Sequence, residues 1–345
     1  MKTILITGGA GFFGELLKFR LLELGHTCVS IDLKPDATQH PKLQAIQGDI
    51  RDTTTLKKIF AAHRFDAVMH CAAVLAHSLK DTRLLWTSNV DGTRNIADFA
   101  ARNKVPNVVF TSSNCLWGES LHRPVTEDDV PAPIELYGRS KWEGEKIIAE
   151  YADRFNAVTI RCPTIMDCGR LGLLSILFEF IDEGRKVWVV GKGSNRYQFI
   201  FAQDLIDACI RAMDYPKSNV FGIGSDNVTT MAEVFSYVID RANTGARLAH
   251  LPKGPTLFLM KLAHWLHVSP LGPYHYKMIA EDFTFDTTRI KRELGWQPTL
   301  TNGEMLFRAY NYYHANLEEI RSRSDVSPHK QPAKMGVIKI LKWMS

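Results

Sequence analysis

Residues 1–14 read MKTILITGGAGFFG, an apolar run that leads directly into a glycine-rich turn. The glycines of interest are Gly8, Gly11 and Gly14, and a helix-like segment over 15–24 follows them. A strand, a glycine turn and a helix in this order bring backbone N–H groups and the positive end of the helix dipole to one point, where a pyrophosphate can bind. The stretch therefore predicts a dinucleotide-binding site.

Asp32 tests this interpretation, because it ends a second apolar run over 28–31, eighteen residues after Gly14. A carboxylate at the end of the second strand can accept hydrogen bonds from both adenosine ribose hydroxyls and repels a 2′-phosphate. NAD is therefore expected rather than NADP, although the nearby Lys34 weakens that preference.

Apolar runs alternate with amphipathic segments through the first half of the chain. Strands buried on both faces need helices on both sides, so the alternation predicts an α/β fold with a Rossmann-type, doubly wound parallel sheet. The expected strands are 4–7, 28–31, 43–47, 67–71, 108–112 and 158–161, and the expected helices are 15–24, 53–63, 83–103 and 139–154.

The alternation becomes irregular after about residue 165. We expect an NAD-binding Rossmann domain over 1–165, with return segments near 195–215, and a smaller, mixed α/β substrate-binding domain over 166–313. The basic tail, 314–345, ends in VIKILKWMS. Two interpretations of it stay open: a disordered or domain-packing tail, and a weak contact with a membrane surface.

The composition is that of an ordinary globular protein. Of the 345 residues, 45% are hydrophobic and 23% are charged, with a net charge of +5. No basic block interleaved with aromatic residues is present, so we expect no nucleic-acid partner. The six cysteines lie apart, which favours free thiols and a cytoplasmic location. Histidine and cysteine spacing gives no reason to expect a metal, and no apolar run reaches the roughly 20 residues that span a bilayer.

The segment Tyr137-Gly-Arg-Ser-Lys141 carries a phenol and an ammonium four residues apart. On a helix these side chains share a face, and a cation beside a phenol lowers its pKa towards working pH, as a general acid or base requires. An ordinary helix-surface pair is the competing interpretation. Ser113 follows the expected strand over 108–112 and can hydrogen-bond the same substrate oxygen, which favours catalysis.

Motifs along most of the chain follow a recognisable order. They are Thr7–Gly14, Gly48–Ile50, His70–Ala73, Asn89–Thr93, Ser113 with Tyr137 and Lys141, Arg161–Pro163, Asp204–Leu205 and Arg292–Pro298. With these motifs the chain resembles the extended short-chain dehydrogenases/reductases of the NAD-dependent epimerase/dehydratase type, from residue 1 to about residue 313. The resemblance implies NAD as the cofactor and hydride transfer at a secondary alcohol or ketone.

The resemblance also implies roles for single residues. Tyr137 would be the general acid/base, Lys141 would lower its pKa and hold the nicotinamide ribose, and Ser113 would orient the substrate oxygen. A homodimer would form through the helices near 83–103 and 139–154. The residues expected to contact the cofactor are Gly8, Gly11, Phe12, Phe13, Gly14, Asp32, Asp49, Ile50, Cys71, Ala72, Ala73, Asn89, Ser112, Tyr137, Lys141 and Pro163.

The residues after Ser113 bear on the reaction. Dehydratases of this family carry Asp-Glu there, whereas this chain has Asn114-Cys115, so dehydration is not expected. Enzymes of the fucose-synthase branch use a cysteine in the place of Cys115 to exchange protons. Their partner histidine is missing near 168–171, and a structural cysteine is the alternative.

The main expectation is a nucleotide-sugar 4-epimerase, with Ser113, Asn114 and Arg196 as substrate residues. A diphosphate needs cations in a dry pocket, and Arg196 lies close to the place where the family carries an arginine. Further candidates for that role, unless they are solvated surface charges, are Arg170, Arg185 and Lys192.

The alternative is a dehydrogenase or reductase of an apolar alcohol or ketone, similar to hydroxysteroid dehydrogenases. Trp117 and the apolar stretch over 256–267 favour it, although that stretch also fits a core helix. A non-catalytic dinucleotide-binding regulator is a third class, which the intact Ser113, Tyr137 and Lys141 disfavour.

Overall fold

The computed structural model describes residues 1–75, 81–265 and 279–322, and its centre is a parallel sheet of seven strands in the order β10-β6-β5-β4-β1-β2-β3. The predicted α/β fold with a doubly wound sheet is confirmed. The order reverses between β1 and β4, and ligands of such sheets bind at that reversal, outside the carboxyl ends of the strands. The strands are β1 (Thr3–Thr7), β2 (Thr27–Asp32), β3 (Leu43–Gln47), β4 (Ala67–His70), β5 (Asn107–Ser113), β6 (Asn156–Cys162) and β10 (Asn219–Gly222).

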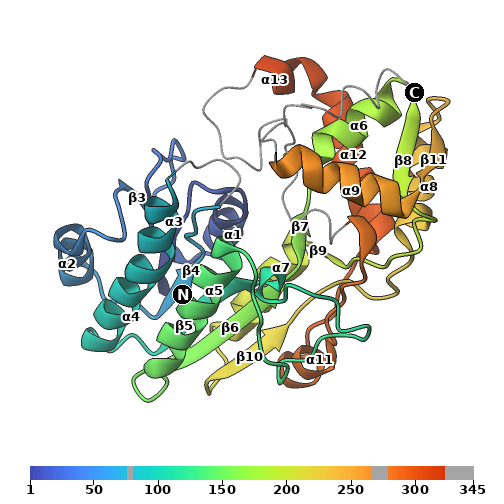
Figure 1. Ribbon diagram of the computed structural model, residues 1–345. Coiled ribbons are helices and arrows are strands. Elements are labelled where there is room, and N and C mark those ends of the chain that lie inside the picture. Colours follow the sequence, from blue (N-terminus) through green and yellow to red (C-terminus); the bar gives the residue numbers. More distant parts are fainter. Residues whose placement is uncertain (76–80, 266–278, 323–345) are drawn as a thin grey trace.

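Helices cover both faces of the sheet (Figure 1). Ile4 and Ile6 of β1 enter one core with Leu17 of α1, whereas Leu5 enters a second core with Leu56 of α2. Because side chains alternate along a strand, β1 contributes to both cores, which explains its unbroken apolar run. The helices around the sheet are α1 (Phe12–Glu23), α2 (Thr53–Ala62), α3 (Thr82–Trp86), η2 (Thr87–Asp91), α4 (Gly92–Arg102), α5 (Leu136–Glu150) and α7 (Ala202–Ala212).

A second group of elements lies beyond the carboxyl ends of the strands (Figure 1). It contains two parallel strand pairs, β7 with β9 and β8 with β11, and a core of its own. Its members are β7 (Thr164–Met166), α6 (Leu174–Asp182), β8 (Lys186–Val190), β9 (Phe199–Phe201), α8 (Met231–Ala242), β11 (Arg247–Leu251), α9 (Lys253–Trp265), α12 (Asn302–Ala315) and α13 (Leu317–Ser322).

Two motifs that lie far apart in the sequence meet at the start of α7. The Trp296 side chain is fully buried, and its indole N–H donates to the carbonyl of Asp204 at 2.8 Å. The Asp204 carboxylate accepts hydrogen bonds from the backbone and hydroxyl of Thr299, at 2.8 and 2.7 Å. Residues 288–299 therefore return to the sheet, and Ile290 and Trp296 belong to the same core as Ile4.

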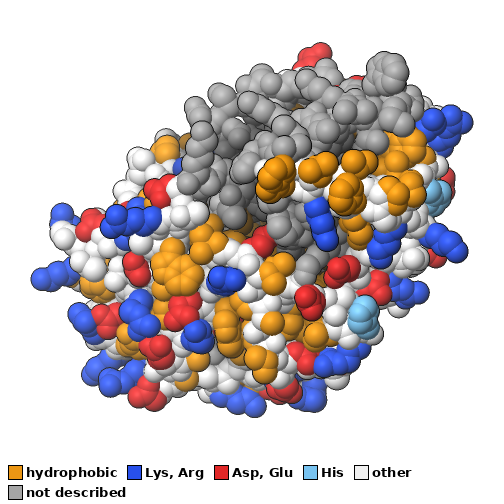
Figure 2. Space-filling view, in the orientation of Figure 1, with side chains coloured by type: hydrophobic (Ala, Val, Ile, Leu, Met, Phe, Trp, Pro, Cys, Tyr) orange, Lys and Arg blue, Asp and Glu red, His pale blue; other side chains and the backbone are white. Residues whose placement is uncertain are grey.

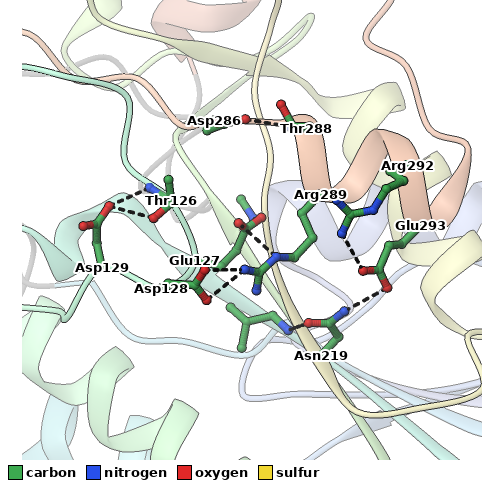
Figure 3. A network of polar contacts seen from close by, with 12 residues as sticks. Thr126, Glu127, Asp128, Asp129, Asn219, Asp286, Thr288, Arg289, Arg292 and Glu293 are labelled. Carbon is green, nitrogen blue, oxygen red and sulfur yellow. Dashed lines mark hydrogen bonds and ion pairs between the residues drawn. The ribbon is translucent and has the colours of Figure 1, made fainter.

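A polar network fixes the segment that follows β5 (Figure 3). Arg289 of α11 (Thr288–Leu294) pairs with Asp128 at 2.7 Å and with Glu127 at 3.3 Å. Glu127 also accepts the backbone N–H of Gly222 in β10 at 2.9 Å, and Arg161 donates to its carbonyl at 3.0 Å. Burial raises the pKa of Glu127. This network holds the segment between Ser113 and α5 against the sheet.

Within the described ranges, no helix is long and apolar enough to cross a membrane. The tail residues 323–345, on which the membrane-contact interpretation falls, lie outside the described residues.

Candidate active site

The glycine turn is closed so tightly that side chains are excluded from it. Gly8 has φ +77°, a conformation that favours glycine, and a Cβ on Gly14 would lie 2.1 Å from the Gly8 carbonyl oxygen. Gly11 is the N-cap residue of α1, and it has no side chain that could accept a hydrogen bond from the first N–H groups of the helix. The turn thus forms the backbone cradle that a pyrophosphate requires, and NAD fits it.

Carboxylates follow the next two strands of the sheet. Asp32 accepts the backbone N–H of Ala10 at 3.0 Å and that of Lys34 at 2.9 Å, which places its carboxylate beside the glycine turn. The Asp49 carboxylate is bound by Arg51, with distances of 2.9 and 3.1 Å from the guanidinium Nε. Although burial opposes it, this pairing holds the pKa of Asp49 below its ordinary value.

His70 connects β4 to the glycine turn and to α4. Its Nδ1 lies 2.6 Å from the hydroxyl of Thr7, and its Nε2 lies 2.8 Å from the hydroxyl of Thr93. Since Thr93 donates to the carbonyl of Asn89 at 2.6 Å, His70 donates through Nε2 and accepts through Nδ1. Burial, with the Lys141 charge as a second cause, lowers the pKa of His70 to about 3, so the ring is neutral.

Asn89 extends the same network to the helix that carries the tyrosine. Its side chain pairs with both backbone groups of Val74, at 2.7 and 3.0 Å, and so holds the chain that leaves β4. It also donates to the Ser140 hydroxyl at 2.9 Å, and Ser140 donates to the Tyr137 carbonyl at 2.7 Å. Asn89 lies in a π-helical turn, a local irregularity that often marks a functional site.

Ser113 and Tyr137 meet where β5 ends. The Ser113 side chain acts on the Tyr137 phenol and lowers its pKa, and Ser113 also accepts the N–H of Cys115 at 3.1 Å. Gly138 makes this approach possible, because a Cβ there would lie 2.2 Å from the carbonyl oxygen of Cys115. The start of α5 therefore packs directly on the turn after β5.

The electrostatics of this pair differ from the prediction. Desolvation raises the pKa of Tyr137 above its ordinary value, and the hydrogen bond with Ser113 and the charge of Arg170 oppose that rise. The Lys141 ammonium lies 4.1 Å from the centroid of the Phe110 ring, among buried groups, and its role in lowering the pKa of Tyr137 stays a prediction. Burial lowers the pKa of Lys141 itself to about 8.

Arg170 lies at the site more directly than the sequence indicated. Its guanidinium is 5.8 Å from the centroid of the Phe12 ring at the start of α1, and its charge also acts on Tyr137 and Cys162. From the sequence, Arg170, Arg185 and Lys192 were equivalent candidates for binding a diphosphate. Arg185, by contrast, pairs with Glu183 at 2.6 Å. The sequence contains one signal for this position of Arg170, which is the glycine that precedes it. In the structure Gly169 adopts φ +78° and turns the chain just before Arg170.

The two residues expected to bind substrate beside Ser113 have other contacts. Asn114 is buried and donates to the Tyr197 hydroxyl at 2.6 Å. Arg196 precedes Tyr197, is exposed, and donates to the carbonyl of Val228 at 3.2 Å. Because adjacent side chains of an extended segment point to opposite sides, Arg196 is directed away from Asn114.

The described residues behind the apolar-substrate alternative lie in two different surroundings. Trp117 is buried against Phe283 and Phe285, and the Arg161 guanidinium lies 5.2 Å from its ring centroid. In the described part of the stretch over 256–267, Phe258 and Trp265 are exposed, so a core helix is also the wrong interpretation.

The remaining candidates lie along the same edge of the sheet, at or just after the ends of strands. These cofactor candidates are Phe12 and Phe13 at the start of α1, which follows β1, Ile50 after β3, Cys71, Ala72 and Ala73 after β4, Ser112 within β5 and Pro163 after β6.

No cluster of three or more residues that could hold a metal occurs in the part of the chain that the structure describes.

Residues 4–224 match the model of the NAD dependent epimerase/dehydratase family. The chain belongs to this family. It is therefore an NAD-dependent enzyme of the extended short-chain dehydrogenase/reductase type, and the predicted family, cofactor and enzymatic nature are confirmed.

Individual members of the family are recognisably similar. An uncharacterized protein of Sinorhizobium fredii, y4nG, is 36% identical over 345 residues, which cover 99% of this chain and 86% of that protein. The UDP-glucose 4-epimerase of Neisseria meningitidis serogroup C is 30% identical over 274 residues, covering 68% and 80% of the two chains. The crystal structure of UDP-glucose 4-epimerase from Thermotoga maritima superimposes with a TM-score of 0.76 at 22% identity, covering 91% of this chain and 99% of that one.

Proposed function

We propose that this family member is a 4-epimerase of a nucleotide sugar. The observation that carries the proposal is the pairing of Ser113, at the carboxyl end of β5, with Tyr137, at the start of α5, on the edge of the sheet that carries the glycine turn. The similarity to the Neisseria UDP-glucose 4-epimerase supports the sugar substrate.

The pair supplies the proton chemistry that such a reaction needs. Tyr137 takes the proton of a sugar hydroxyl and later returns it, while Ser113 holds the same oxygen in place. NAD, bound on the glycine turn, supplies the redox chemistry by accepting and returning hydride. Because the pKa of Tyr137 is raised by desolvation, the Arg170 charge that opposes this rise becomes important for releasing the phenolic proton.

The cofactor roles follow the positions of the residues. Gly8, Gly11 and Gly14 would hold the pyrophosphate through the backbone, and Asp32 would accept from the adenosine ribose. Lys141 is too deeply buried to act as a surface charge, and it lies beside His70 and Phe110 under the carboxyl edge.

The test combines retained cofactor with turnover. Protein purified without added cofactor is denatured and assayed for released NAD, and interconversion of UDP-glucose and UDP-galactose is followed by NMR. Tyr137→Phe is expected to lower turnover by roughly 10²–10⁴-fold while NAD stays bound. Tyr151→Phe is the matched control, because that tyrosine ends the same helix and stacks on Phe155 at 5.9 Å.

The dehydrogenase alternative predicts a different result. NADH would accumulate in step with substrate consumed, and no epimer would form. Equal turnover by wild type and Tyr137→Phe would contradict catalysis by the pair altogether.

A homodimer is part of the proposal. α4 and α5 lie side by side (Figure 1) and are joined by an ion pair between Arg94 and Glu150 at 2.8 Å, so they offer one continuous two-helix face. Light scattering on the purified protein tests whether two copies associate. The cytoplasmic location stays a prediction, supported by six free cysteines.

A further inference from the structure

Helix α9 presents its bulkiest apolar side chains to solvent. Phe258, Leu262 and Trp265 follow the i, i+4, i+7 spacing of one helical face, whereas Leu257 and Met260 are half-buried. This is the reverse of an ordinary surface helix, whose outer face is polar. The exposed fractions are 67% for Phe258, 60% for Leu259, 39% for Leu262 and 73% for Trp265.

The charges on the helix have a single sign. Lys261 is exposed, the Lys253 ammonium donates to the Ala280 carbonyl at 3.1 Å, and the thirteen residues of α9 include no acidic side chain. Figure 2 shows hydrophobic side chains gathered over α9, with basic side chains beside them. Apolar and aromatic side chains combined with lysines are typical of a helix that lies in the interface of an anionic membrane.

The size of the patch helps to identify its partner. Four side chains of this kind expose on the order of 500 Å² of apolar surface, given aromatic areas of 150–250 Å² each. A stable protein–protein contact takes roughly 800 Å² of total surface from each partner, so it would also have to cover polar neighbours of the patch with matching groups. A bilayer requires no matching protein surface, since an interfacial helix needs only an apolar face inserted at the headgroup boundary and basic residues against the phosphates.

We propose that α9 docks the protein on an anionic lipid surface. Phe258, Leu262 and Trp265 insert at the headgroup boundary, and Lys261, which lies on the same face of the helix, contacts lipid phosphates. This proposal does not depend on the nucleotide-sugar assignment, because none of these side chains belongs to the catalytic edge of the sheet.

The test is flotation of the full chain with lipid vesicles. Vesicles of phosphatidylcholine mixed with phosphatidylglycerol are expected to carry the protein, vesicles of phosphatidylcholine alone to carry much less, and added salt to weaken the binding because it screens the lysines. The double variant Phe258→Gln with Trp265→Gln is expected to lose at least about tenfold in apparent affinity. Val130→Gln is the control, because Val130 is 81% exposed elsewhere on the surface and should bind like wild type.

Three outcomes would overturn the proposal. The first is wild type that floats with neither vesicle type, the second is a double variant that floats as well as wild type, and the third is a double variant that changes only the oligomeric state in size-exclusion chromatography. The second result would assign binding to another segment, and the third would assign the patch to a second copy of the chain. Circular dichroism and retained NAD establish that the double variant is folded, so that a loss of flotation reports on docking.

Discussion

Replacing His70 by asparagine tests whether a neutral, buried imidazole fixes the glycine turn. His70 bonds to Thr7 at 2.6 Å and to Thr93 at 2.8 Å, and it is fully buried. Asparagine can replace one of these contacts but not both. A buried polar group left without its partner costs roughly 1–3 kcal/mol, so at pH 7.5 His70→Asn should lower the free energy of unfolding by about 2 kcal/mol.

The pH dependence makes the prediction specific. The pKa of His70 is lowered to about 3 in the folded protein, by burial first and by the charge of Lys141 second. In the unfolded chain it is about 6.5, so below that pH only the unfolded state binds the proton. The stability is therefore complete above pH 6.5 and is lost as the pH falls, by about 1.4 kcal/mol per pH unit. Between pH 6.5 and 5 wild type should lose about 2 kcal/mol from this group alone.

The assay is urea unfolding of wild type and His70→Asn at several pH values between 7.5 and 5. All other groups titrate in both proteins, so the difference between the two curves isolates His70, and it should shrink by about 2 kcal/mol towards pH 5. The exposed His250, whose ring contacts the Gly191 carbonyl at 3.0 Å, provides the control His250→Asn, which leaves the contacts of His70 with Thr7 and Thr93 in place. A difference that stays constant across the range would refute the neutral buried imidazole.

Three further predictions concern the catalytic edge. Burial lowers the pKa of Lys141 to about 8. We therefore expect kcat/KM to fall as the pH rises through about 8, because the Lys141 ammonium then loses its proton. A kcat/KM profile that stays flat up to pH 10 would contradict a role for the Lys141 charge. Arg170→Gln should lower kcat on the order of tenfold, because the charge that opposes the raised pKa of the phenol is lost, while Arg185→Gln leaves kcat unchanged in the same steady-state assay. Gly14→Ala forces a methyl group against the Gly8 carbonyl and should abolish the retention of NAD. The control Gly254→Ala should retain NAD, because nothing lies within 4 Å of the added carbon. Equal NAD content in the two purified variants would count against the pyrophosphate cradle.

The sequence predicted those parts of the fold that depend on local patterns. The β1 turn and the alternation of strands and helices are encoded within short windows, and they correctly indicated the doubly wound sheet. The pairs β7 with β9 and β8 with β11 were not predicted, because each joins short segments that lie far apart in the chain. The pKa of Tyr137 and the exposure of α9 were also beyond reach, since both depend on which surfaces the folded chain buries.

Candidate site residues that are distant in sequence are linked by buried hydrogen bonds rather than by proximity alone. Thr7 adjoins the glycine turn, and the chain of contacts runs from it through His70 and Thr93 to Asn89, and on through Ser140 to the backbone of Tyr137. Because each donor in this path has its acceptor, a shift of α5 would break several buried hydrogen bonds at once. The distance between the proposed pyrophosphate cradle and the phenol thus depends on polar residues of which Asn89 alone is expected to contact the cofactor. We therefore expect the strand-end histidine to matter to catalysis although its neutral ring takes no part in proton transfer.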